Sequence, residues 1–238
     1  MRSMPGPRRI DGFGPLSPTV LAVPQGIYSH IRARRRRPRK GLSRPAASSA
    51  KEGPRLPLFY LDVETTGDDP QQDRIVSIQY QQLGDDLAPV GPFQIMAEWE
   101  WGEKQILYMI LEKGVLEPTW DFVPVGNRVR FDLTFLIERA TRWQLLAWDP
   151  ARILYFWYTK PLLDLQPLLV LMNRGEFAGA SLHAFSDKER GARVPAMYRE
   201  GRYAEIIEYV TRERNAALEI LHGARDVLVP LGDARRKA

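Results

Sequence analysis

Two carboxylates stand two residues apart at the end of an apolar segment that has the length of a β-strand. The apolar segment is LPLFYLDV (Leu56–Val63), which is rich in aromatic and branched residues. Asp62 is its last residue but one, and Glu64 follows it directly. On an extended chain, side chains two residues apart point to the same face. Such a pair supplies half of an oxygen-rich site for Mg²⁺ or Mn²⁺. A bare D-x-E motif also occurs at ordinary strand ends, but the apolar strand before it and the turn at Gly67 after it favour a functional interpretation.

A second acid opens a predicted helix in the middle of the chain. The short strand predicted at WDFVPV (Trp120–Val125) is followed by GNRVRFDLTFL, in which Phe131, Phe135 and Leu136 recur at helical spacing. Asp132 stands in the first turn of that helix, on a different face from the two phenylalanines. By itself, an acid in this position is explained by its interaction with the helix dipole.

A third candidate lies on a helix predicted from Tyr203 to about Ala224, which has an apolar stripe at helical spacing. Tyr209 and Glu213 are four residues apart, so they lie one above the other on one helix face. The alternative is that Glu213 is an ordinary solvated residue, because arginines flank it on both sides.

In this order, the motifs LDVETTG, VGNRVRFDLTFL and EYVTRERNAALEIL resemble those of DEDD-type 3′–5′ exonucleases of the ribonuclease H-like superfamily. The third motif is similar to the Tyr-x-x-x-Asp version, and the stretch from Leu58 to about Leu221 looks like the proofreading exonuclease domain of family B DNA polymerases. The sequence departs from that pattern at position 213, where Glu replaces Asp. The longer side chain displaces the carboxylate, and Mg²⁺ demands near-ideal octahedral geometry.

The resemblance implies a role for each of these residues. It implies two ions, Mg²⁺ or Mn²⁺, with Asp62 bridging them, Glu64 and Glu213 completing the first site, and Asp132 at the second. Tyr209 would orient the attacking water. The resemblance also implies that the substrate strand is contacted by two further residues, Thr65 and Asn127.

Charge divides the chain into two parts. Residues 1–55 carry 13 basic and 2 acidic side chains and 56–238 carry 21 and 27, for net charges of +11 and −6. The first part is rich in Pro, Ser and Arg without periodicity, which predicts a disordered basic tail. The tail is interpreted as a nucleic-acid-binding arm, an Arg-rich targeting segment, or an upstream stretch included by a wrongly chosen start codon. Residues 56–238 are predicted to form one domain.

Composition excludes several classes. The chain has no cysteine, so it has no disulfide and no thiolate zinc site, which fits a reducing, intracellular (cytoplasmic) location. No apolar run approaches the ~20 residues of a membrane span.

His30, His183 and His222 are too scattered for a histidine metal site, and His183 is expected to be a packed or partly exposed helix residue. The aromatic clusters WEW (99–101) and LYFWY (154–158) are expected to be mostly buried, with base stacking as the alternative.

The alternation of strand and helix patterns predicts an α/β, ribonuclease H-like fold with a central mixed sheet of about five strands and helices on both faces. The expected strands are Leu58–Val63, Ile75–Leu83, Phe93–Glu98, Trp120–Val125 and Pro161–Asp164. The expected helices are Glu103–Val115, Phe131–Arg142, Leu165–Asn173 and Tyr203–Ala224.

The function expected from these features is metal-dependent 3′–5′ exonuclease activity on a single-stranded 3′ end, with DNA favoured over RNA as the partner. One alternative is a non-catalytic nucleic-acid-binding module that keeps the fold but is impaired at position 213. Another is an adaptor that binds nucleic acid only through residues 1–55. No membrane partner is expected, and the sequence carries no signal for an oligomeric state.

Overall fold

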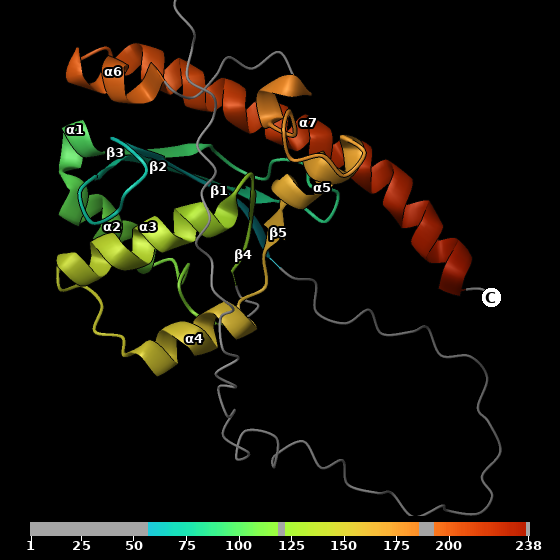
Figure 1. Ribbon diagram of the computed structural model, residues 1–238, viewed down its shortest axis with the longest axis horizontal. Coiled ribbons are helices and arrows are strands. Elements are labelled where there is room, and N and C mark those ends of the chain that lie inside the picture. Colours follow the sequence, from blue (N-terminus) through green and yellow to red (C-terminus); the bar gives the residue numbers. More distant parts are fainter. Residues whose placement is uncertain (1–56, 119–121, 186–192, 237–238) are drawn as a thin grey trace, which may run out of the picture. The chain divides into compact units, whose positions relative to one another are not determined.

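The structure is a computed structural model that describes residues 57–118, 122–185 and 193–236. Its centre is a five-stranded mixed sheet with the strand order β3-β2-β1-β4-β5 (Figure 1). The strands are β1 (Leu58–Thr65), β2 (Ile75–Leu83), β3 (Gln94–Ala97), β4 (Val123–Gly126) and β5 (Leu163–Asp164). Strands β1, β2 and β3 pair antiparallel, whereas β4 and β5 continue the sheet in parallel from β1. The predicted α/β architecture with a mixed sheet is therefore confirmed, and the predicted basic tail lies outside the described residues.

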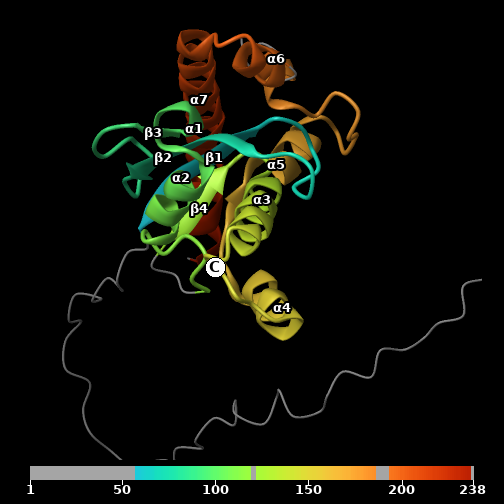
Figure 2. The ribbon, with the colours of Figure 1, turned by 90° about the vertical axis from the view of Figure 1, so that its left-hand side faces the viewer.

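Helices cover both faces of this sheet, as Figures 1 and 2 show. Helices α2 and α3 lie on one face, and the long helix α7 crosses the other. The helices are α1 (Glu98–Trp101), α2 (Glu103–Leu111), α3 (Val129–Arg142), α4 (Pro150–Thr159), α5 (Leu165–Met172), α6 (Val194–Arg199) and α7 (Tyr203–Arg236), with a short 3₁₀ helix at Leu182–Ala184. In the described part of the chain, no helix is both long and apolar enough to cross a bilayer.

The alternation of side chains along β1 decides which face receives its acids. Leu61 and Val63 are buried in the core that includes residues of α2 and α3. Tyr60 is buried in the other core, together with residues of α5 and α7. Because alternate residues of a strand share a face, Asp62 and Glu64 lie on the same face as Tyr60, which is the face that α7 covers.

Three short helices and one long extension differ from the sequence expectation. Residues 98–101, 150–159 and 194–199 form α1, α4 and α6, and α7 continues twelve residues beyond the expected end at Ala224. The helical segments α1 and α6 are too short to show a periodic apolar stripe. Asp149 is the N-cap of helix α4: its carboxylate accepts a hydrogen bond from the Arg152 backbone N–H at 2.7 Å, which explains why the helix starts at Pro150.

The expectation that the two aromatic clusters are mostly buried was wrong. On α4 only Phe156 is buried, while Tyr155 and Tyr158 are 59% and 82% exposed, and at the end of α1 Trp101 is 58% exposed. The reason is that α4 presents a single stripe to the core, so its consecutive aromatic residues cannot all point inward.

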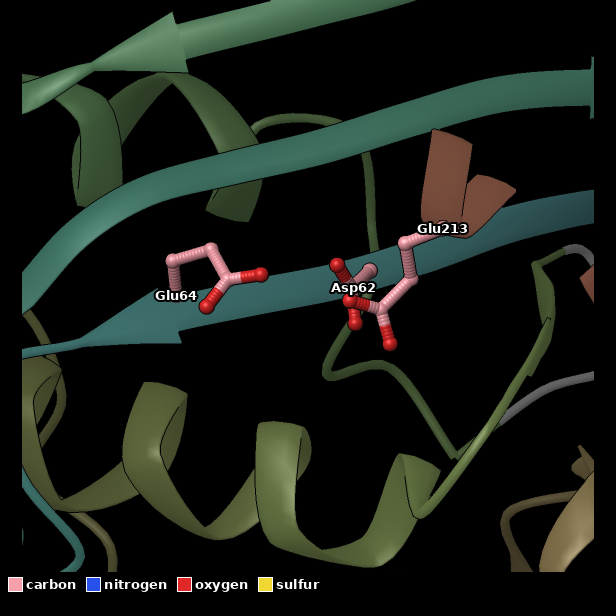
Figure 3. Close-up of side chains that lie close together, drawn as sticks. All are labelled: Asp62, Glu64 and Glu213. Carbon is pink, nitrogen blue, oxygen red and sulfur yellow. The ribbon is translucent and has the colours of Figure 1, made fainter. Parts of the chain in front are cut away.

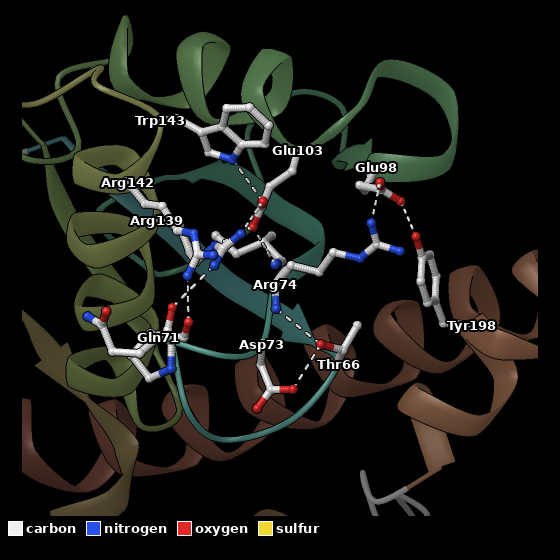
Figure 4. Close-up of polar contacts among 12 residues, drawn as sticks. Thr66, Gln71, Asp73, Arg74, Glu98, Glu103, Arg139, Arg142, Trp143 and Tyr198 are labelled. Carbon is white, nitrogen blue, oxygen red and sulfur yellow. Dashed lines mark hydrogen bonds and ion pairs between the residues drawn. The ribbon is translucent and has the colours of Figure 1, made fainter.

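A buried ion pair joins the start of α2 to the end of α3 (Figure 4). The Glu103 carboxylate accepts hydrogen bonds from Arg139 Nε at 2.8 Å and Nη2 at 2.6 Å, from the Trp143 indole at 2.8 Å and from the Ile75 backbone N–H at 2.8 Å. Arg139 Nη1 also donates to the Pro70 carbonyl at 3.3 Å. This network ties both helices to the loop that connects β1 to β2.

Breaking this pair on one side should destabilise the protein strongly. The Arg139 and Glu103 side chains are only 7% and 4% exposed, so Arg139→Met leaves a buried carboxylate without its cation. We expect a loss of about 3–5 kcal/mol in the free energy of unfolding, measured by urea denaturation. The double variant Glu103→Leu/Arg139→Met should lose less stability than the single variants Glu103→Leu and Arg139→Met lose together. Arg142→Met, at an exposed position, is the matched control and should lower the free energy of unfolding by about 1 kcal/mol or less. Equal losses in Arg139→Met and Arg142→Met would show that the buried pair contributes no special stability.

Candidate metal centre

Three carboxylates from β1 and α7 converge on the face of the sheet beneath α7. Asp62, Glu64 and Glu213 each offer one oxygen, and these oxygens all lie within 4.8 Å of one another. Figure 3 shows the Glu213 side chain descending from α7 to lie beside Asp62. Asp62 and Glu213 are both only 7% exposed. Like charges held this close in a buried place repel one another, so the cluster needs a cation or bound protons to offset its charge.

Asp132, in the first turn of α3, faces the same region but does not belong to that group of three. It is buried, with 3% of its surface exposed. Burial, followed by the charges of Asp62 and Glu213, raises the pKa of the Asp132 carboxyl well above its usual range. Its Oδ2 atom is buried and has no hydrogen-bond partner among the described residues. Such a buried oxygen needs an explanation, and a bound cation or a bound proton would supply one.

The turn before α3 is held close to β1 by local geometry. At Gly126 a Cβ atom would come within 2.5 Å of the Leu61 carbonyl oxygen, so only glycine permits this approach of β4 to β1. Arg128 adopts a left-handed conformation with φ of 61°, and its backbone N–H donates to the Asp164 carboxylate at 2.9 Å. These contacts hold the turn that carries Asn127 and leads into α3 close to β1.

Tyr209 lies one turn before Glu213 on α7 and is 3% exposed. Burial raises the pKa of the Tyr209 phenol, and the Glu213 carboxylate, which is also its hydrogen-bond partner, raises it further. The phenol therefore stays protonated at neutral pH, so that it can donate a hydrogen bond and cannot act as an anionic base.

A cavity of about 710 Å³ opens over these residues. All seven of the sequence-derived site residues line it: Asp62, Glu64, Thr65, Asn127, Asp132, Tyr209 and Glu213. Thr65 is nearly buried, and its hydroxyl donates to the Gly67 carbonyl at 2.6 Å. At Gly67 a Cβ atom would lie 2.4 Å from the Asp73 carboxylate, so a larger residue there would force the Asp73 side chain to move.

Sequence reasoning missed a group of lining residues that come from α5, from α6 and from the stretch between them. They are Gln166, Phe177, Ser181, Leu182, His183 and Pro195. His183 is half-buried in the short 3₁₀ helix, and its Nδ1 atom lies 2.8 Å from the Ser181 hydroxyl oxygen. None of these residues stands in a motif, since the tertiary fold alone brings this segment to the cavity, and no local signal identifies them.

The residues present fit a divalent cation. Hard cations such as Mg²⁺ and Mn²⁺ prefer carboxylate oxygens, and the site offers three within 4.8 Å of one another. Asp132 adds a fourth carboxylate with a buried oxygen that has no donor among the described residues. No thiolate or imidazole belongs to the cluster of three, which favours a hard cation over a softer metal.

Protonation of Asp132 should be visible in the stability of the metal-free protein. Its pKa is raised in the folded state, so the stability that its proton contributes is present below the ordinary carboxyl pKa and is lost as the pH rises through the raised value. In EDTA, Asp132→Asn should therefore melt at a higher temperature than the wild type at pH 8, and the gap should close toward about pH 4. Thermal melts across this range test the prediction. A gap that does not change with pH would show that the Asp132 carboxyl does not titrate this way.

No protein-family model and no curated protein matches the sequence, whereas solved structures do match the fold. Exonuclease I of E. coli in complex with a dT13 oligonucleotide aligns over 76% of this chain and 43% of its own, with 12% identity and a TM-score of 0.50. A moderately thermophilic exonuclease I from Methylocaldum szegediense aligns over 50% of this chain and 29% of its own, with 19% identity and a TM-score of 0.39. The zinc-bound complex of E. coli exonuclease I with single-stranded DNA covers 76% and 43%, with 12% identity and a TM-score of 0.48.

The first of these similarities confirms the fold. The domain has the ribonuclease H-like α/β fold that it shares with exonuclease I, with a five-stranded mixed sheet flanked by helices. The chain spans less than half the length of the exonuclease I chains that it matches. In this fold it carries a cluster of three acidic residues, two of them buried, that is suited to a divalent cation.

Proposed function

We propose that this protein is a metal-dependent 3′–5′ exonuclease that hydrolyses phosphodiester bonds of single-stranded nucleic acid. The observation that carries the proposal is the convergence of Asp62, Glu64 and Glu213 within 4.8 Å at the floor of an open cavity. The match to exonuclease I in fold supports it, because that enzyme was solved with a single-stranded DNA oligonucleotide.

The chain's own residues divide the work between metal binding and water placement. Asp62, Glu64 and Glu213 would hold one divalent cation, and Asp132 together with Asp62 would hold a second. When bound, such ions stabilise the attacking and leaving oxygens of an in-line displacement at phosphorus. The buried, protonated phenol of Tyr209 is positioned to orient the water by hydrogen bonding.

Two further residues that line the cavity are proposed to contact the substrate. Asn127 and Thr65 would contact the terminal nucleotide, as the resemblance in the second and first motifs implies. The Asn127 side-chain oxygen is buried and has no partner among the described residues, which leaves it available to a donor on the substrate. The spacing of Tyr209 and Glu213, four residues apart on α7, supports the finer likeness to polymerase proofreading domains, although Glu stands where their pattern has Asp. The absence of cysteine fits activity in a reducing, intracellular compartment.

The proposal is tested by incubating the full-length protein with linear and circular single-stranded DNA and with linear RNA. We expect digestion of linear DNA with Mg²⁺ or Mn²⁺, none in EDTA and none of the circle. Digestion of the circle would show an endonuclease. Inactivity toward every substrate with both metals, combined with retained binding of the oligonucleotide, would favour the second candidate, a binding module impaired by Glu at position 213.

Removal of residues 1–55 should separate catalysis from the adaptor hypothesis. A chain starting at Leu56 should keep cooperative melting and the rate on short oligonucleotides, because all three motifs follow residue 55. It should bind long nucleic acid more weakly and with a shallower salt dependence, since fewer phosphates are neutralised. Melting curves and salt titrations measure both effects. Loss of all nucleic-acid binding on truncation would support the adaptor hypothesis instead.

A further inference from the structure

A second cavity, of about 590 Å³, lies beyond the loop that leaves β1. It shares no lining residue with the metal centre, and its wall is formed by Arg74, Glu98, Trp101, Gly102, Glu103, Lys104, Gln105, Tyr108, Trp143 and Leu145. One loop separates the two cavities: Thr65, Gly67 and Asp68 line the first, and Arg74 lines the second. Across the base of this loop, Thr66 N–H donates to the Arg74 carbonyl at 2.9 Å and Arg74 N–H donates to the Thr66 hydroxyl at 3.0 Å. These hydrogen bonds join the two ends of a loop that contributes residues to both cavities.

Three exposed aromatic side chains line this second cavity. Trp101, Tyr108 and Trp143 are 58%, 47% and 40% exposed. The polar atoms of two of them are already engaged, because the Trp143 indole donates to Glu103 at 2.8 Å and the Tyr108 hydroxyl donates to Glu112 at 2.6 Å. What these rings still offer a ligand is apolar surface, which suits the π-face of a nucleobase.

Of the four charged side chains that line the second cavity, three belong to ion pairs within the described part of the chain and Lys104 does not. The carboxylate of Glu103 is neutralised by buried Arg139, and Glu98 pairs with Arg74 at 3.5 Å and accepts a hydrogen bond from the Tyr198 hydroxyl. Figure 4 shows the Arg74 side chain reaching from the loop toward Glu98. The Arg74 side chain is still 49% exposed. Lys104 is exposed and has no ion-pair partner within the described residues.

From this combination we infer that the second cavity binds an unpaired nucleotide of the substrate strand, upstream of the 3′ end held at the metal centre. The base stacks on the exposed rings, chiefly Trp101, and a phosphate lies against Arg74 and Lys104. Aromatic stacking and cationic contacts to the backbone are the two features by which proteins hold single strands without reading their sequence. The inference rests on the proposed function, since it supplies the second point of contact for the same strand.

The test measures binding in EDTA, where nothing is cleaved, by fluorescence anisotropy of labelled oligothymidylates. Trp101→Ala should weaken binding of a 12-mer by roughly 5- to 150-fold, the range expected for one stacked base, and leave binding of a 3-mer unchanged. Tyr158→Ala, at the 82% exposed ring on α4 outside both cavities, is the matched control and should change neither. Lys104→Gln should reduce the salt dependence of 12-mer binding by about one phosphate contact.

A photo-cross-link locates the nucleotide directly and keeps the test independent of any change in folding. A 12-mer with 5-iodouracil at internal positions should cross-link to wild-type protein at Trp101, Tyr108 or Trp143, identified by mass spectrometry. Unchanged 12-mer affinity of Trp101→Ala, cross-links confined to other elements, or no binding by the wild type would overturn the inference. If only the proposed function is wrong, the result is different: the wild type digests nothing with Mg²⁺ or Mn²⁺, while the 12-mer still binds and cross-links at the second cavity.

Discussion

Replacing Asp62 by asparagine should abolish nuclease activity while the fold persists. Asp62 is the most central acid of the cluster, since Glu64 shares its strand face and Glu213 lies beside it (Figure 3). A neutral amide is a poor ligand for a hard cation. Loss of a residue that only hydrogen-bonds to a metal ligand already lowers activity or metal affinity by about 10–100-fold. Loss of a ligand itself should therefore lower activity by more than that. Initial rates on a linear oligonucleotide with Mg²⁺ and with Mn²⁺ measure the effect.

The folded state supplies the control for this variant. Without metal, removal of one of several repelling carboxylates relieves repulsion, so Asp62→Asn should melt at the same or a higher temperature than the wild type in EDTA. Asp226→Asn makes the same chemical change at a 74% exposed side chain on α7 and should keep full activity. Full activity of Asp62→Asn with Mg²⁺ would show that Asp62 holds no catalytic ion.

Position 213 should show the next largest effect, together with a dependence on the metal used. The Glu213 carboxylate reaches the cluster from α7, one methylene further from its backbone than an aspartate would be. Because Mg²⁺ tolerates distorted geometry poorly, we expect measurable activity with Mg²⁺ that rises markedly with Mn²⁺. Glu213→Asp should narrow this gap, and Glu213→Gln should be nearly inactive with either metal. Steady-state rates for the three proteins with both metals decide between these outcomes.

Glu219→Gln, an exposed position on the same helix, controls for the loss of a charge on α7. Equal rates for wild type and Glu213→Gln would mean that the site works as three carboxylates, Asp62, Glu64 and Asp132. In that case the close approach of Glu213 to Asp62 would have no catalytic meaning.

The parts of the fold that were predictable are those with a local signal. Strand β1 was recognised from a continuous apolar run, and its period of two placed Asp62 and Glu64 on one face. The period of α7 placed Tyr209 and Glu213 on one face as well. Neither pattern says which face of the sheet α7 covers. That follows in the structure from the burial of Tyr60 with residues of α7 and of Leu61 with residues of α2 and α3.

What sequence reasoning missed depends on contacts between distant residues. Glu103 and Arg139 are 36 positions apart, and an acid at a helix start and an arginine near a helix end have ordinary explanations of their own. His183 reaches the cavity through an irregular segment without periodicity. Helix α4 was missed because its consecutive aromatic residues suggested a buried cluster rather than a helix with one buried ring.

The spacing of the four acids could be foreseen only in part. The sequence placed Asp132 beside the others through its resemblance to a family motif, and in the structure Asp132 lies outside the group of three whose oxygens fall within 4.8 Å of one another. Burial, followed by the charges of Asp62 and Glu213, nevertheless raises the pKa of its carboxyl. This arrangement suits a residue of the proposed second metal site.

The direction of digestion is the most direct test of the proposed exonuclease. A linear single-stranded DNA oligonucleotide is labelled either at its 5′ end or at its 3′ end and incubated with the full-length protein and Mn²⁺. The proposed mechanism predicts a ladder of shortening 5′-labelled products, and release of the 3′ label as a mononucleotide at the earliest time points. Both should be absent in EDTA and with Asp62→Asn. Early release of the 5′ label as a mononucleotide, or intact substrate with both Mg²⁺ and Mn²⁺, would contradict it.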